Sequence, residues 1–186
     1  MWDIKSGKYK DTYEMVIDTP ITFKNCYLKN FIAGECAYVR IMVLEGCVFE
    51  QAAFDTCYAN SGMTLDRCQF RNDIFLFAWS GNNQQGKPII ISDCIFDGFV
   101  DMYDAWFEGP ITVSRNRFIK GTNLLGNRGQ PYQVRFDVAP IIEENERKLD
   151  LDGEITSWKN SHNLPNMPIA LGTLPRRKRF LNSNRW

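Results

Sequence analysis

Long hydrophobic runs are missing from this sequence, because no stretch approaches the ~18 consecutive apolar residues that a membrane-spanning helix requires. The opening residues, from Met1 to Lys5, also lack the apolar core of a signal peptide. We therefore expect no membrane span and no signal peptide. The expected location is the cytoplasm, or an intracellular or viral assembly.

The side chains that usually carry catalysis are also scarce. Histidine occurs once, at His162, so a histidine-centred triad or a multi-histidine metal site lacks its parts. The six cysteines include no Cys-x-x-Cys pair, and no Gly-x-x-x-x-Gly-Lys-Ser/Thr phosphate-binding loop occurs. These absences predict no catalytic residues, no cofactor and no metal site.

A long-period repeat is present. Each copy has an apolar residue three positions before an anchor and an aromatic or aliphatic residue two positions after it. The anchors are Cys26, Cys47, Cys68, Cys94 and Asn116, separated by 21, 21, 26 and 22 residues. Apolar residues at alternate positions indicate strands, whereas a helical repeat would show spacings of three and four. The repeat therefore predicts an all-β solenoid of about five coils.

A shorter step of five or six residues runs inside each coil, and each central residue follows a second residue, often small, by two positions. The central residues are Phe23, Leu28, Ala33, Tyr38, Val43, Phe49, Phe54, Ala59, Leu65, Phe70 and Phe75. This pattern resembles the pentapeptide-repeat family over roughly residues 20–126. The resemblance implies a four-sided right-handed parallel β-helix in which both residues point inward. The longer steps, and residues such as Asp73 at a small position, keep a pectate-lyase-like β-helix as the structural alternative.

The cysteines are explained by this repeat without redox chemistry. Cys26, Cys47 and Cys68 recur once per coil, as do Cys36 and Cys57, so each set should stack on one side. A free cysteine behaves as a small buried hydrophobe. We expect packed free thiols, with disulfides or a metal site as the alternative.

The domain prediction has three parts. Residues 1–19 form an N-terminal cap, and residues 20–138 form the β-helix domain with a polar loop insertion at 80–88. Residues 139–186 form an irregular C-terminal extension that ends in a basic arm. A solenoid end needs a cap, because an open coil exposes strand edges and apolar surface.

Two groups of residues are candidates for binding. Trp79, Asn82 and Asn83 lie at the loop insertion, where a rigid scaffold often presents recognition residues. The second group lies in the arm, which combines cations with apolar anchors, and consists of Arg176, Arg177, Lys178, Arg179, Phe180 and Trp186. Residues 127–186 contain 10 basic and 7 acidic residues, against 12 and 15 in residues 1–126.

The leading functional prediction is a non-catalytic structural or protein-interaction module whose partners are other protein subunits. One alternative is a small carbohydrate-binding or carbohydrate-active β-helix that uses Asp97, Asp101 or Asp104, since glycoside cleavage uses paired acids. Another is nucleic-acid binding through the basic tail. Some pentapeptide-repeat proteins imitate DNA with a strongly acidic rod, but the small net charge of residues 1–126 fits that activity poorly.

Overall fold

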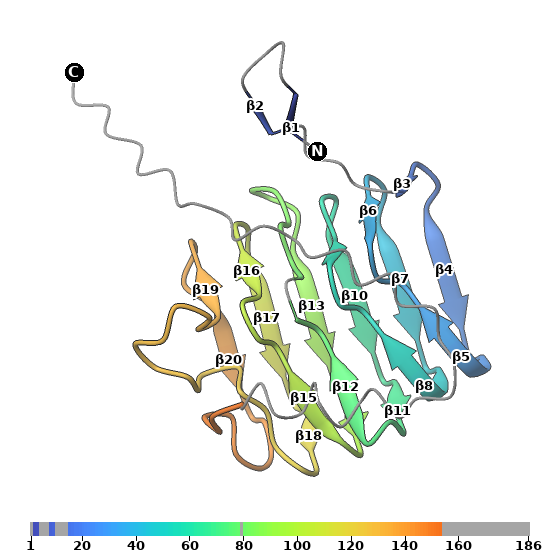
Figure 1. Cartoon of the computed structure of the whole chain (residues 1–186). Coiled ribbons are helices and arrows are strands. Elements are labelled where there is room, and N and C mark those ends of the chain that lie inside the picture. Colours follow the sequence, from blue (N-terminus) through green and yellow to red (C-terminus); the bar gives the residue numbers. More distant parts are fainter. Residues whose placement is uncertain (1, 4–7, 10–14, 79, 154–186) are drawn as a thin grey trace. The chain divides into compact units, whose positions relative to one another are not determined.

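The structure, a computed structural model, describes residues 2–3, 8–9, 15–78 and 80–153. None of these residues is helical, and parallel strands stack coil upon coil (Figure 1). The predicted all-β solenoid of about five coils is therefore confirmed. A short antiparallel pair, β1 (Trp2–Asp3) with β2 (Lys8–Tyr9), precedes the coils in the sequence.

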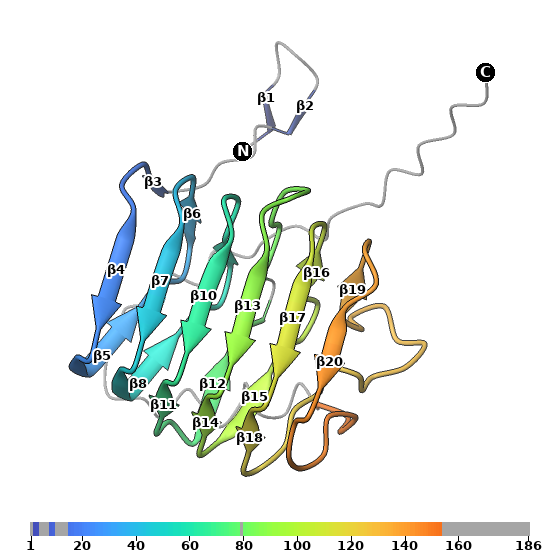
Figure 2. The same cartoon turned by 180° about the vertical axis from the view of Figure 1, so that it is seen from behind.

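The first face of the solenoid is a regular six-stranded parallel sheet in the order β20-β17-β13-β10-β7-β4 (Figure 2). Its strands are β4 (Ile21–Lys24), β7 (Met42–Glu45), β10 (Met63–Asp66), β13 (Ile89–Ser92), β17 (Ile111–Ser114) and β20 (Ile141–Glu143). Every strand pairs in register with the equivalent strand of the next coil, so each outward or inward position forms a column along the solenoid.

The second face is a seven-stranded sheet that follows face 1 in each coil. Its strands are β5 (Tyr27–Ile32), β8 (Val48–Ala53), β11 (Gln69–Phe70), β12 (Ile74–Leu76), β14 (Ile95–Phe96), β15 (Phe99–Asp101) and β18 (Arg117–Phe118). The long strand β8 pairs with β5 on one side and with both β11 and β12 on the other. In the third and fourth coils, two short strands thus replace one long strand.

The third face consists of two short sheets in line. Its strands are β3 (Met15–Ile17), β6 (Cys36–Tyr38), β9 (Cys57–Tyr58), β16 (Trp106–Phe107) and β19 (Arg135–Phe136). Single bridges from Tyr58 to Gly81 and from Gly81 to Trp106 join the two sheets. Because β3 pairs with β6, residues 15–17 are part of the first coil as well as of the predicted N-terminal cap.

Each strand of face 1 ends in the same tight turn, in which one residue has a positive φ. These residues are Asn25, Gly46, Arg67, Asp93, Arg115 and Glu144, with φ between 50° and 61°. The left-handed region is unfavourable for most L-residues. Its recurrence at five non-glycine residues, with four different side chains, shows that the turn geometry, fixed by the coils on either side, overrides local preference.

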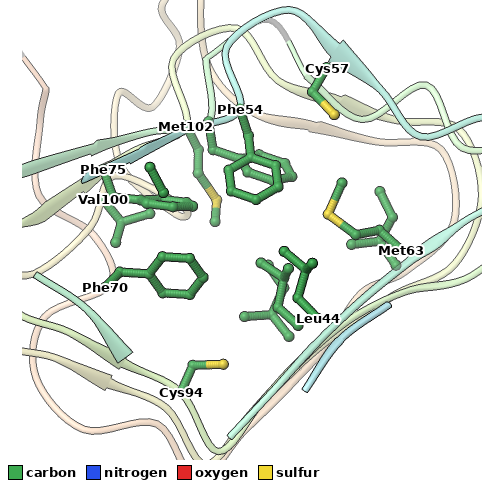
Figure 3. Packing of buried hydrophobic residues seen from close by; sticks show 14 of the residues in the cluster. Leu44, Phe54, Cys57, Met63, Phe70, Phe75, Cys94, Val100 and Met102 are labelled. Atoms are coloured by element: carbon green, nitrogen blue, oxygen red, sulfur yellow. The ribbon is translucent and has the colours of Figure 1, made fainter. Parts of the chain in front are cut away.

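The interior is filled by stacked side chains, seen end-on in Figure 3. Leu44 and Met63 of face 1 point toward Phe70 and Phe75 of face 2, and all four are buried. One column of phenylalanines runs through four coils and consists of Phe49, Phe70, Phe96 and Phe118. Successive ring centroids in this column are 4.9, 4.9 and 5.2 Å apart, with planes within 5° of parallel.

The predicted inward phase is wrong at one strand of face 1, β7, whereas Phe23 and Leu65 on the neighbouring strands point inward as predicted. Val43 was expected to point inward, but Met42 and Leu44 are buried, while Val43 is only half-buried and Ile41 is exposed. The step of six lies between Tyr38 and Leu44, which moves the alternation by one residue. Asp73, assigned to a small inward position, is also exposed, with its carboxylate bonded to Lys120 Nζ at 3.1 Å.

The coils continue beyond residue 138, where the C-terminal extension was predicted to begin. Strand β20 pairs with β17, and the backbone N–H of Leu125 donates to the carbonyl of Leu149 at 2.8 Å. Paired positions on β17 and β20 differ by 29 residues, compared with 22 between β13 and β17. The added length accommodates an exposed loop at residues 128–131. The remaining part of the predicted extension, residues 154–186, lies outside the described residues.

Candidate interaction surfaces

The basic arm, predicted to bind a partner, lies entirely outside the described residues. This applies to Arg176, Arg177, Lys178, Arg179, Phe180 and Trp186, and also to Trp79 of the loop group. Asn82 is half-buried in a left-handed turn, with φ of 49°. Its backbone N–H donates to the Trp106 carbonyl at 2.7 Å, so this residue joins the loop to the next coil.

Asn83 has a structural role that the sequence prediction missed. The side chain is completely buried. Its amide nitrogen donates to the carbonyls of Lys87 at 2.8 Å and Pro110 at 2.9 Å. Asn83 therefore closes the loop and attaches it to the following coil, and it offers no side chain to a partner. The exposed part of the insertion is residues 84–88.

The three aspartates proposed for carbohydrate chemistry occupy different local settings. Asp97 is half-buried and accepts a hydrogen bond from Gln69 Nε2 at 3.0 Å. Asp101 is buried, and its Oδ1 accepts from Asn123 Nδ2 at 2.7 Å and from the Tyr103 backbone N–H at 3.0 Å. Asp104 lies in a turn, with φ of 53°. Asp101 is thus a satisfied polar group at a corner of the coil.

The anchors of the repeat form a buried column along the turn after face 1. In four rungs the backbone N–H of one anchor donates to the side chain of the next. Cys26 N–H donates to Cys47 Sγ at 3.5 Å, and Cys68 N–H donates to Cys94 Sγ at 3.4 Å. Cys94 N–H donates to Asn116 Oδ1 at 2.9 Å. In the last rung, Asn116 N–H donates to Asn145 Oδ1 at 3.0 Å. Asn145 therefore extends the column by one residue that was not among the anchors identified from the sequence.

All six cysteines are free thiols, which agrees with the packing interpretation. Burial raises the pKa of the Cys47 thiol and raises that of Cys57 far above its usual value. These groups are therefore neutral thiols at physiological pH, unsuited to nucleophilic or metal-binding roles that need the thiolate. No group of three or more His, Cys, Asp or Glu residues suitable for a metal ion occurs in the described part of the chain.

Large exposed hydrophobic side chains are concentrated at the two ends of the solenoid. Their exposed fractions lie between 38% and 65%, and they are Met15, Val16, Tyr27, Ile32, Ile41, Ile119, Val138 and Ile141. The first four belong to the first coil, and Ile41 lies at the start of the second coil, next to Ile21. The other three follow Phe118, the last residue of the fifth repeat copy. Among the side chains that the structure describes, which do not include those of residues 74 and 79, none lies between positions 42 and 118. The sides of the middle coils are thus less apolar than the ends.

The last outward residue of each face 1 strand, together with the left-handed turn residue that follows it, forms a column along the solenoid that we call the charged column. It also contains uncharged residues, such as Ser92 and Ser114. Lys24 Nζ lies 2.8 Å from a carboxylate oxygen of Glu45, and Arg67 also pairs with Glu45. The hydrogen bond from Lys24 lowers the pKa of the Glu45 carboxyl. Farther along, Arg115 pairs with Asp93 at 2.7 Å. The column begins with a cation in the first coil and continues with paired charges of both signs.

At its other end this column is acidic. Glu143 and Glu144 are exposed on and after β20, and their negative charges add to that of Asp93 in raising the pKa of Arg115. Glu143 occupies the same outward column as Lys24 of β4 and Glu45 of β7. The two ends of the solenoid therefore carry opposite charge at equivalent positions of face 1.

The strand pairing and the stacked interior define the class of the protein as a parallel β-solenoid. Comparison with known proteins adds no family to that class: no family model matches the chain, no curated protein matches it, and no solved structure matches it. None of the described residues forms a helix that could cross a membrane.

Proposed function

We propose that this protein is a non-catalytic structural and protein-interaction module whose solenoid ends bind other protein subunits. The observation that carries the proposal is the confinement of large exposed hydrophobic side chains to the two ends. Apolar side chains grouped on an exposed surface mark interaction sites, whereas scattered single ones need no explanation. Exposed Tyr27 of β5 and Ile141 of β20 are the clearest examples.

The backbone of the terminal strands supports the same proposal. In a parallel ladder each edge strand directs alternate N–H and C=O groups away from its neighbour. On β4, the N–H groups of Ile21 and Asn25 donate to the second coil, so those of Thr22 and Lys24 point away from it. A partner that supplies a strand satisfies these groups and covers the apolar side chains together.

Site-specific photo-crosslinking tests this proposal. A photoreactive amino acid is placed in the full chain at Tyr27, at Ile141 or, as the mid-solenoid control, at the exposed residue Gln85. Extract from the natural source is then irradiated, and products are identified by mass spectrometry. We expect defined protein adducts from the two end positions and not from Gln85. Equal labelling at all three positions, or none at any, would contradict the proposal.

The basic arm is proposed as a second contact, on the strength of its sequence alone. Arg176, Arg177, Lys178 and Arg179 are followed by Phe180 and Leu181, so cations lie next to apolar anchors. Light scattering of the full chain and of a version ending at Gly153, each with and without source extract, tests this contact. Capture that requires residues 154–186 supports it, and equal behaviour of the two versions contradicts it.

Kinship with the pentapeptide-repeat family is also a proposal. Burial of Cys47 with Phe49 and of Ala52 with Phe54, five residues apart, supports it. The shifted phase at β7 favours the pectate-lyase-like alternative. An experimental structure distinguishes them: a corner within β8 near residue 50 indicates four sides per coil, and one straight strand indicates three.

A further inference from the structure

The two ends of the solenoid match each other, and we propose that a second copy of this chain is the partner that binds there. In this arrangement, which rests on the proposed interaction function, the last coil of one molecule stacks head to tail on the first coil of the next. The parallel ladder of face 1 then continues from β20 of one copy into β4 of the other.

The backbone of the two edges fits this continuation. On β20 the carbonyl of Glu143 accepts from Arg115 N–H, so by alternation the N–H and C=O of Ile142 point toward the open end. On β4 the corresponding groups of Thr22 and Lys24 point toward the opposite open end. Placing Glu143 opposite Lys24 of the second copy aligns these donors and acceptors as in the ladders between β4, β7 and β10.

Charge complementarity selects a second copy over an unrelated strand. Inside the chain, Lys24 already pairs with Glu45 of the following coil across one strand spacing. In the stacked pair, Glu143 meets Lys24 of the second copy across the same spacing. The cationic start of the charged column thus follows its acidic end, and opposite charges directly across neighbouring strands are favourable.

The apolar interiors of the two ends also complement each other. Half-buried Phe23 and Leu28 pack against the core from the first coil, while Ile142 and Leu149 do so from the last. Stacking covers both layers as the middle coils cover one another. The anchor column continues as well, because its last described member, Asn145, is followed by Cys26 of the second copy.

Sedimentation velocity of the purified full chain over a concentration series tests the proposal. We expect reversible association that grows beyond a dimer, because a head-to-tail contact leaves both outer ends open. The variants Lys24→Glu and Glu143→Lys should each weaken association by about tenfold at low salt. Mixing the two variants should restore association beyond a dimer, because both kinds of mixed junction bring opposite charges together. In one of them the unchanged Glu143 and Lys24 meet, and in the other the two changed positions meet.

Two further variants separate stacking from loss of stability. Thr22→Pro removes an N–H that points away from β7, so it should abolish association and leave the unfolding midpoint of the monomer nearly unchanged. Arg71→Glu is the control, because it breaks a surface ion pair with Glu50 in the middle of the solenoid, as Lys24→Glu breaks one in the first coil. It should leave association unchanged.

A protein that stays monomeric at all concentrations, or whose association is insensitive to Thr22→Pro and to both charge reversals, overturns the stacking proposal. Its failure is distinct from failure of the proposed function. If stacking fails, the photo-crosslinking experiment has two further outcomes. Tyr27 and Ile141 crosslink either to a different protein or to residues 1–14 or 154–186 of the same chain. Only the first of these results preserves the interaction function.

Discussion

Replacing Phe70 with alanine should be among the most damaging single changes to this fold. Phe70 is fully buried at the centre of the phenylalanine column. Its ring stacks on Phe49 and Phe96 at 4.9 Å each and meets Phe75 at 4.6 Å. Phe→Ala changes in cores cost about 3–5 kcal/mol, and each aromatic pair adds about 0.5–1.5 kcal/mol beyond area burial. We expect a loss near the upper limit, about 5 kcal/mol.

Phe118→Ala provides the matched comparison. Phe118 is equally buried but stacks on one neighbour of the column, Phe96, at 5.2 Å. Its loss should therefore be smaller by about 1 kcal/mol. Phe70→Leu should cost about 1.5 kcal/mol or somewhat more, because it retains most of the apolar volume. Urea unfolding followed by circular dichroism measures all three. A loss below 2 kcal/mol for Phe70→Ala, or a smaller loss than for Phe118→Ala, would refute the reasoning.

Three further predictions concern the anchors and the thiols. Asn116→Ala leaves the Cys94 N–H unpaired and removes one hydrogen bond to the Ile91 carbonyl, so it should cost about 2–4 kcal/mol in urea unfolding. Asn116→Cys, which copies the preceding rungs, should cost less than half as much. In the native protein, Ellman's reagent should label half-buried Cys26 and Cys36 first and the other four cysteines only on unfolding; fast labelling of all six would contradict their burial. Burial raises the folded-state pKa of Cys57, so its contribution is complete below the unfolded thiol pKa of about 8.5 and falls by about 1.4 kcal/mol per pH unit above it. Cys57→Ala should lessen this alkaline loss, and an unchanged slope would exclude that cause.

The long-range organisation of this fold could be predicted from the sequence because one coil is one repeat. The anchors at 26, 47, 68, 94 and 116 do lie in one column, as their spacing indicated, and all of them except half-buried Cys26 are buried. Alternation of apolar and polar residues identifies a strand, and its recurrence one coil later identifies the strand with which it pairs. The outward column that contains Lys24 and Glu45 occupies the third residue after the first apolar position of each copy in the same alignment.

The details that sequence reasoning missed depend on contacts between coils. Val43 was predicted to point inward because the sequence does not show where in the coil the additional residue of a six-residue step is inserted. The structure places this residue before β7, so Leu44 points inward instead. Asn83 looks like a loop residue in sequence, but its partner is the Pro110 carbonyl in the next coil. Arg67 and Arg115 carry no signal for a left-handed turn. In each case the neighbouring coil decides the conformation, and that neighbour is 20 or more residues away.

The same dependence on neighbours explains why the ends are the places to look for function. In a middle coil, the strands are hydrogen-bonded on both edges and the apolar interior is covered on both sides by adjacent coils. Only its outward side chains are in contact with solvent. A terminal coil keeps one edge and one layer that no further coil of the described chain covers. Because its two ends differ in charge, with Lys24 at one and Glu143 at the other, like ends repel and unlike ends attract. If the proposed stacking occurs, it therefore runs head to tail and continues until another surface covers an end.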